Sequence, residues 1–437
     1  MTVWAEWSHP PAAAPAAANA ATAAVERDVV WAYGVMLFAI FILHRFGVPA
    51  AGSEVPLMFP ICLAGLGWLM LRGRAFVETG RLILLAGFAA AAALSALANG
   101  GSLSWTSLAL LFAIYIPMVL MMPVSPATRL RCLDLFQRFV LFVCVAGAIQ
   151  FLAQFVIPGP RLFTFAGIVP EALLRPGSHT VIPLPARAGL YKSNGFFLGE
   201  PSSLSQFAAL GLIVELLYFR RRLFLLACVA GLVLSYSGTG LVLLAAFLPL
   251  VLFRTAGFGT TVLLGLLGLL VVGFGELIYL DAITQRAEEF NSPHSSGFAR
   301  FLSPLYVLDR VMHQNPSALL FGFGPGSITN YLAGLEFTAH DPTWIKLLFE
   351  YGTLGFLTFA AFIAYCVFHG SRSWILGGAL LFFYCFLGGF LLTPLGGYVM
   401  LLLAILPRET LPRETRLRET MAPAGAERGA APWPRAS

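Results

Sequence analysis

Charged residues are scarce in this chain. Of its 437 residues, 11% are Asp, Glu, Lys or Arg and 58% are hydrophobic, and the mean hydropathy is +0.82. A soluble globular protein carries roughly 25% charged residues, so this shortage excludes that class and indicates that lipid is the main solvent. The apolar runs do not alternate in polarity, and most approach the roughly 20 residues that a membrane helix needs. They therefore predict an all-α, polytopic membrane protein rather than a barrel.

Cysteine is also scarce, and it is absent from the longest polar segments. Five of the six cysteines lie in apolar runs and the sixth lies in a short basic loop. This distribution gives no disulfide framework and no cysteine-based metal site. No spacing of His, Asp and Glu is typical of a metal site either, so no metal is expected.

The two ends of the chain differ in composition from the apolar middle. Residues 1–28 are rich in Pro and Ala and lack the basic stretch that opens a signal peptide. Residues 407–437 repeat a Pro-Arg-Glu-Thr unit and end in Ala, Pro and Gly. We predict that both are disordered cytoplasmic tails and that residues 29–406 form one transmembrane domain.

Twelve apolar runs are the candidate spans. The seventh, eighth and twelfth are short for a bilayer, so ten or eleven spans is the alternative count. The runs are Val29–Phe46, Val55–Leu71, Arg81–Ala98, Trp105–Pro123, Phe139–Ile157, Leu204–Phe219, Leu223–Ser235, Thr239–Phe253, Phe258–Leu280, Trp344–Phe368, Trp374–Leu391 and Thr393–Leu406.

The arginines predict how the spans are oriented. They gather in alternate short loops, around Arg72–Arg81, Arg129–Arg138 and Arg220–Arg222, whereas the intervening short loops have almost none. Cytoplasmic loops carry such an excess of positive charge. With an even number of spans, both termini are cytoplasmic. The expected location is the inner membrane of a bacterium, with both long loops in the periplasm.

Two long polar loops, at about 158–203 and 281–343, interrupt the apolar runs. Their mixture of cations, histidines and carboxylates suits work on an anionic substrate at the membrane surface. Their ionisable residues of interest are Arg161, Arg175, His179, Arg187, Lys192 and Glu200 in the first loop, and Arg286, Arg300, Arg310, His313, His340 and Asp341 in the second.

The first loop ends in Glu200-Pro201-Ser202-Ser203, directly before an apolar run. This pattern predicts a helix start with its N-cap at Ser202 or Ser203. One interpretation is a helix start and nothing more. The other is an anion site, in which Arg187 and Lys192 add positive charge to the helix N-terminus.

The second loop contains Arg300 and then three glycines at alternate positions, Gly322–Gly326. Such glycines predict a tight turn or a close approach of two backbones. The loop closes with His340 and Asp341, ahead of Glu350–Gly352 in the tenth run. A lone His or Asp in a loop is usually only solvated. Several cations beside a His-Asp pair at the mouth of a helical bundle favour a functional site.

In their order along the chain, these segments resemble the motifs of the O-antigen ligase and polymerase superfamily, which includes the Wzy-type polysaccharide polymerases. The pattern is closer to exopolysaccharide polymerases of the xanthan type than to lipid A–core ligases, because Asp341 stands where the ligase-like pattern has His. Lys192 stands where many members have Arg, and Arg187 is the substitute. The matching segments are Lys192–Ser202, Ser237–Gly240, Arg300 with Gly322–Gly326, and His340–Gly355.

The resemblance implies a GT-C-like architecture and a metal-independent, inverting glycosyltransferase without a cofactor. Such an enzyme moves a glycan from undecaprenyl pyrophosphate to a hydroxyl of another lipid-linked repeat unit. A departing pyrophosphate needs fixed cations, and the implied ligands are Arg300, Lys192 and Arg187. The acceptor hydroxyl needs a base, and the implied candidates are Asp341 or His340, with Glu200 as a further one.

Three other functions stay open. A ligase of the same superfamily moves finished glycan onto another acceptor. A lipid-linked oligosaccharide transporter is expected to show charged or broken helices at mid-membrane and internal repeats, whereas the predicted spans are nearly free of charge and show no repeat. A structural assembly subunit is the third. The expected partners are a lipid-linked oligosaccharide, membrane lipid and, for a polymerase, a chain-length-regulating co-polymerase; no nucleic acid is expected.

Overall fold

The computed structural model describes residues 15–50, 53–99, 104–157, 159–165, 167–175, 178–184, 189–257, 259, 295, 297–335, 339–371 and 373–409. Within these residues the chain is mostly helical. The predicted ninth span, Phe258–Leu280, falls almost wholly outside the described residues, as do Arg187 and Arg286.

Five helices of the described chain are long and apolar enough to cross a membrane. Large apolar side chains such as Leu97, Leu226 and Leu357 are exposed on the outside of the helices. Extended apolar surface of this kind is unusual on a soluble monomer and, with the composition, indicates a membrane-embedded helical protein. The five are α3 (Thr79–Ala98), α5 (Pro126–Ala153), α6 (Pro201–Val214) with its π-helical end η4 (Glu215–Phe219), α8 (Gly238–Ala256) and α14 (Thr343–Gly370).

The remaining helices are shorter or start in a terminal segment. α1 (Pro15–Ile42) includes residues 15–28, which were predicted to be a disordered tail; this segment is rich in alanine, the best helix former. The shorter apolar helices are α2 (Met58–Leu71), α4 (Trp105–Tyr115) with η1 (Ile116–Val119), α7 (Arg222–Leu234), α15 (Trp374–Phe386), and α16 (Pro394–Met400) with η9 (Leu401–Ile405).

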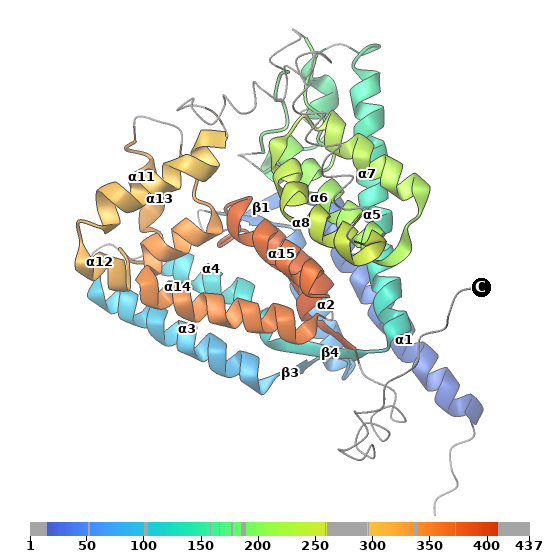
Figure 1. Ribbon diagram of the computed structural model, residues 1–437, viewed down its shortest axis with the longest axis horizontal. Coiled ribbons are helices and arrows are strands. Elements are labelled where there is room, and N and C mark those ends of the chain that lie inside the picture. The colour runs from blue at the N-terminus through green and yellow to red at the C-terminus, as the bar shows by residue number, and fades with distance from the viewer. Residues whose placement is uncertain are drawn as a thin grey trace, which may run out of the picture.

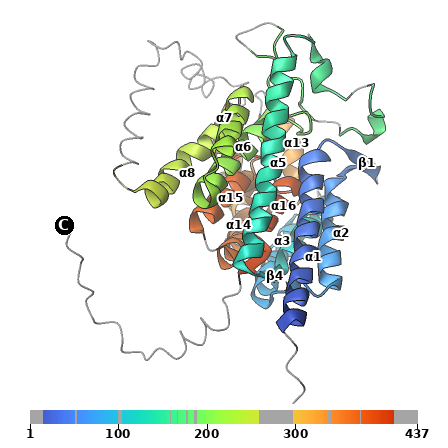
Figure 2. The ribbon, with the colours of Figure 1, turned by 90° about the vertical axis from the view of Figure 1, so that its right-hand side faces the viewer.

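The helices form two groups that α15 joins. α3 runs along α14 on one side of the molecule, while α5, α6, α7 and α8 pack together on the other, with α1 between α2 and α5. α15 contacts both α14 and α8 (Figure 1). Viewed from the side, α1, α2 and α5 stand nearly parallel (Figure 2). One apolar core runs through both groups.

Two small sheets depart from the all-α prediction. β1 (Gly47–Ala50) and β2 (Ser53–Pro56) form an antiparallel hairpin. β4 (Leu120–Val124) pairs with β3 (Phe76–Val77) on one edge and, in parallel, with β5 (Pro407–Glu409) on the other. The start of the predicted C-terminal tail is therefore a strand. The buried Arg129 guanidinium, 3.3 Å from the Glu409 carboxylate, holds it in place.

The two long loops contain short helical segments. The first has η2 (Pro160–Phe163) and η3 (Glu171–Leu173). In the second, the described part has η7 (Phe298–Leu302), α11 (Ser303–Val307), η8 (Leu308–Met312), α12 (Pro316–Phe321) and α13 (Ser327–Leu332).

Helix α6 begins at Pro201, with Glu200 in the N-cap position and no side-chain cap bond. The predicted N-cap at Ser202 or Ser203 was therefore wrong. Proline suits the first helical position because a backbone N–H there has no partner within the helix, so its absence costs nothing. The fixed φ angle of proline is also close to that of a helix. Glu200 therefore lies at the very start of the helix, and its side chain does not cap it.

Helix α14 is broken at Gly352, which has φ 66° and ψ −173°. Residues other than glycine almost never adopt this combination of φ and ψ. The turn of Gly322–Gly326 fits into the break: the Phe323 N–H donates to Phe349 O at 2.8 Å, and the Gly324 N–H donates to Glu350 O at 3.0 Å. The close backbone approach predicted for these glycines is confirmed.

We predict that Gly352→Ala destabilises the protein by at least about 1–3 kcal/mol, the usual cost of such a backbone conformation. A Cβ at this position would also collide with the Leu320 carbonyl. Unfolding of the detergent-solubilised protein measures the loss. Gly87→Ala is the matched control, because a Cβ there meets nothing within 4 Å in helix α3. Equal stabilities of the two variants would contradict this interpretation.

Candidate functional site

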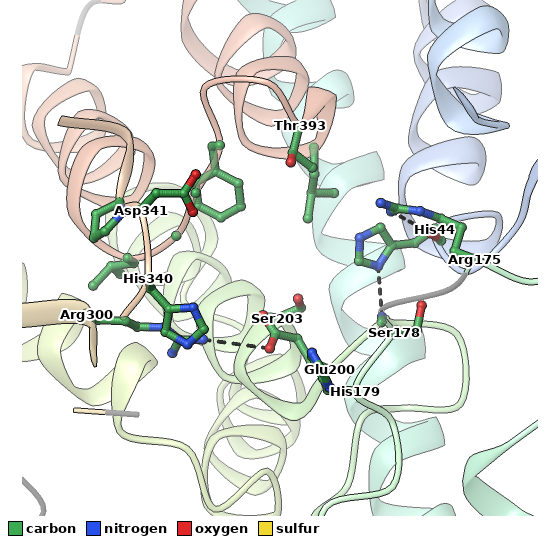
Figure 3. A pocket seen from close by; sticks show the side chains of 17 residues that line it. His44, Arg175, Ser178, His179, Glu200, Ser203, Arg300, His340, Asp341 and Thr393 are labelled. Atoms are coloured by element: carbon green, nitrogen blue, oxygen red, sulfur yellow. Dashed lines mark hydrogen bonds and ion pairs between the residues drawn. The ribbon is translucent and has the colours of Figure 1, made fainter. Parts of the chain in front are cut away.

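The two long loops meet at one cavity of about 250 Å³. Figure 3 shows Arg300 and His340 on one side of it and His44 and Arg175 on the opposite side, with Glu200 below. Four of the six predicted site residues, Glu200, Arg300, His340 and Asp341, line this single space. The remaining wall is mostly backbone and apolar side chain from Leu387–Leu395, between α15 and α16.

An ion pair joins the two loops across the cavity. The Arg300 guanidinium, from η7, lies 3.7 Å from the Glu200 carboxylate at the start of α6. The Arg300 side chain is 13% exposed, so its charge is largely withdrawn from bulk water yet faces the cavity. An arginine held in this way presents its fork of N–H donors to a phosphate or carboxylate oxygen.

His340 lies beside Arg300 because the His340 backbone N–H donates to Ala299 O at 3.0 Å. Burial, and then the positive charge of Arg300, lower the pKa of His340 from its usual value of 6.5. A histidine with a lowered pKa is neutral at pH 7. Its ring then carries one donor and one acceptor nitrogen rather than a second positive charge beside Arg300.

Asp341 is held by a lysine that sequence analysis did not single out. The Lys346 ammonium lies 2.7 Å from Asp341 Oδ2 and 3.8 Å from Glu350 Oε1, within the first turns of α14. The Lys346 side chain is only 8% exposed and that of Glu350 is fully buried, whereas Asp341 is 33% exposed. A buried cation needs such partners. The arrangement fixes one oxygen of Asp341 and leaves the other for a ligand.

Gly389 allows Asp341 to reach this position. A Cβ on Gly389 would lie 3.1 Å from both the backbone oxygen and Oδ1 of Asp341. The neighbouring Gly388 carbonyl accepts bonds from the Thr343 N–H and hydroxyl, each at 3.2 Å. The segment that follows α15 is therefore hydrogen-bonded to the start of α14, next to the Asp341 carboxylate.

His44 and Arg175 form the opposite wall and were not predicted as site residues. The Gly199 N–H donates to His44 Nδ1 at 2.9 Å, so the proton of the neutral ring is on Nε2. Burial, followed by the charges of Arg175 and Arg45, lowers the pKa of His44 to about 3. The Arg175 guanidinium donates to His44 O at 3.3 Å. His44 follows α1 and stands apart from both loops in sequence, so the loop pattern did not reveal it.

The other two predicted pyrophosphate ligands are placed differently. Lys192 is not among the residues that line the cavity, and its backbone N–H donates to Ile182 O at 2.9 Å. The segment after it turns toward α5, where Gln150 Oε1 accepts bonds from the backbone N–H groups of Asn194 and Gly195. Arg187 lies outside the described residues. Arg175, from the same loop, occupies the cavity wall instead.

The segment Ser237–Gly240 packs α8 onto α6 close to the site. The Gly240 N–H donates to the Ser205 hydroxyl at 3.1 Å, and this hydroxyl donates to Ser237 O at 3.0 Å. A Cβ on Gly240 would collide with the Ser205 backbone. This motif supports the helix that carries Glu200 and does not reach the cavity.

Among the described residues, no group of three or more His, Cys, Asp or Glu side chains is arranged to hold a metal ion. The cavity instead combines two arginines, three histidines and two carboxylates with backbone from the α15–α16 connection. No family model and no curated protein matches the chain. The chemistry of the cavity must therefore be argued from its own residues.

We predict that Arg300→Gln raises the pKa of His340 toward 6.5, because the variant removes a neighbouring positive charge. Diethyl pyrocarbonate modifies only the neutral ring, so the modification of His340, followed by mass spectrometry, falls as the pH drops through its pKa. The midpoint should shift to higher pH in Arg300→Gln and stay unchanged in Arg310→Gln, whose side chain is exposed and outside the cavity. A midpoint that does not move would show that Arg300 does not act on His340.

Proposed function

We propose that the protein is a polysaccharide polymerase that joins oligosaccharide repeat units carried on undecaprenyl pyrophosphate. The observation that carries this proposal is the single cavity that Arg300 and Arg175 line together with Asp341, His340 and Glu200. A transfer from a lipid pyrophosphate needs cations for the leaving group and a proton acceptor for the attacking hydroxyl. Both kinds of group occur here within one space. The resemblance to the O-antigen ligase and polymerase superfamily supports the same reaction.

In the proposed reaction, a hydroxyl oxygen of the acceptor attacks the anomeric carbon of the donor glycan. The bond from this carbon to the pyrophosphate oxygen breaks, and the pyrophosphate leaves with the electron pair. Arg300 and Arg175 neutralise the charge that develops on it. The hydroxyl proton goes to the oxygen of Asp341 that Lys346 does not hold. We prefer Asp341 to His340 because a proton on His340 would place a second cation beside Arg300.

The proposal includes the location of the site. The arginine-rich short loops support cytoplasmic termini and a cavity that opens on the opposite, periplasmic face of a bacterial inner membrane. The long loops that build the cavity then meet the lipid-linked substrate where it is exposed to water. Twelve spans and a GT-C-like architecture belong to this proposal, as does a co-polymerase that sets chain length.

A deletion strain tests the function. We expect single repeat units on undecaprenyl pyrophosphate to accumulate on the periplasmic side, with no long polymer, when lipid-linked glycans and secreted polymer are resolved by mass spectrometry and size. Long chains still attached to the lipid carrier would instead identify a ligase. Single units confined to the cytoplasmic face would identify a transporter and overturn the proposed reaction.

Arg300→Ala should leave the protein in the membrane but abolish chain growth. Removal of one group that stabilises developing charge slows a reaction by roughly 10²- to 10³-fold, which is enough to remove long polymer. Immunoblotting of membranes measures the amount of protein, and gel analysis of the polymer measures chain growth. Arg310→Ala, which removes an exposed arginine from the same loop, is the control. Full-length polymer from Arg300→Ala would remove Arg300 from the mechanism.

A further inference from the structure

A second cavity, of about 270 Å³, adjoins the first. Its walls come from β2 and the start of α2, from one face of α4, and from the residues that precede α16. Arg175 and Thr393 line both cavities and therefore form the boundary between them. Figure 3 shows the Thr393 side chain directed into the first cavity from above.

The two cavities differ in chemistry. The first is lined by cations, carboxylates and histidines. Apart from Arg175 at the boundary, the second is lined by uncharged side chains. These comprise the hydroxyls of Thr106, Ser107 and Thr393 and apolar groups that include the ring of Phe59. Hydroxyls both donate and accept hydrogen bonds, and an aromatic ring offers a flat apolar surface. This combination fits a ligand with many hydroxyls, apolar C–H faces and no charge.

We propose that the second cavity binds the neutral saccharide of the acceptor, so that Arg175 and Thr393 lie between donor pyrophosphate and acceptor sugar. This inference rests on the proposed function and assigns the acceptor to residues that, apart from Arg175, lie outside both long loops. Each cavity by itself is slightly smaller than the roughly 300–1,000 Å³ of small-molecule sites, and the two together fall within that range. A two-substrate transferase needs such a divided space, because the reacting atoms must meet at the boundary.

The wall of the second cavity is fixed to the reaction site. The Ser104 N–H, at the start of α4, donates to Pro325 O at 3.1 Å. The neighbouring Gly326 approaches so closely that a Cβ there would lie 3.0 Å from the Ser107 hydroxyl. The same glycine turn is bonded to Glu350 O in α14. The Gly322–Gly326 turn therefore connects the α4 wall of the second cavity to the first part of α14, which positions Asp341.

Arg175 is fixed at the boundary by its backbone and its side chain. Its N–H donates to Arg45 O at 3.0 Å, and its guanidinium donates to His44 O at 3.3 Å. Both acceptors lie in the segment that leads into the β1–β2 hairpin, and β2 itself contributes Val55 and Pro56 to the second cavity. The β1–β2 hairpin and the segment before it thus hold Arg175 at the boundary and also form part of the wall of the second cavity.

The test enlarges two side chains that line the second cavity and do not line the first. Ser107→Leu removes a hydroxyl and adds bulk, and Leu110→Phe adds bulk alone. Ala109→Leu adds the same kind of bulk on the exposed face of α4 and is the matched control. The full-length protein in nanodiscs is titrated with two probes: the repeat-unit oligosaccharide released from its carrier, which has no leaving group, and farnesyl diphosphate, which has no sugar.

We expect Ser107→Leu and Leu110→Phe each to weaken oligosaccharide binding at least tenfold, while the affinity for farnesyl diphosphate stays within twofold of the wild-type value. Ala109→Leu should leave both affinities unchanged. The oligosaccharide should also compete as an acceptor in chain growth by the wild-type protein, and less so in the filled variants.

Unchanged oligosaccharide binding in both filled variants, or an equal loss for the two probes, would overturn the assignment of the second cavity. Weakened farnesyl diphosphate binding alone would make it a site for the lipid carrier and would overturn the assignment as well. The proposed function fails separately, when the wild-type protein transfers no glycan in the presence of lipid-linked repeat units.

Discussion

The close contact between two glycines, Gly322 and Gly352, determines how the site is built. A Cβ on either would collide with the backbone of the other segment, so α14 breaks where the glycine turn enters. The same junction is bonded to α3, because the Ser95 hydroxyl donates to Glu350 O at 2.8 Å and Asn99 donates to Gly322 O at 3.0 Å. The break therefore anchors the Gly322–Gly326 turn of the second loop to a long apolar helix.

A chain of ionisable side chains runs from this junction to the cavity. Glu350 is fully buried, Lys346 lies between it and Asp341, and Asp341 is partly exposed. Burial of a lysine is costly unless carboxylates surround it, and here two do. Because Lys346 draws Asp341 toward the helix, the carboxylate is oriented before any ligand arrives. Preorganised groups of this kind spend no energy on rearrangement during a reaction.

Of the residues that meet in the cavity, the sequence predicted only residues of the two long loops. Glu200, Arg300, His340 and Asp341 were predicted from the mixture of ionisable residues in the two loops and from the family resemblance of the segments that contain them. His44 was not, because it follows a helix and reaches the site only through the fold. Lys346 was missed because it occupies one position of an otherwise apolar helix. Lys192 was predicted as a phosphate ligand, yet its segment is anchored to α5 through Gln150. A pattern of residue types shows which groups are available, whereas packing decides which of them share a space.

The broken helix bears on the choice between a transferase and a transporter. A discontinuous helix with ionisable residues is typical of transporter sites, where unwound backbone groups coordinate the substrate. In this protein those groups are already occupied: the N–H groups of Phe323 and Gly324 bond the carbonyls of Phe349 and Glu350, and Lys346 lies between two carboxylates. A transporter must open its central site alternately to both sides, and here that movement would break several of these bonds at once. The partly exposed residues, Asp341 and the Arg300–Glu200 pair, lie instead in the cavity that the loops form. A site whose backbone groups are bonded internally supports the proposed catalysis rather than transport.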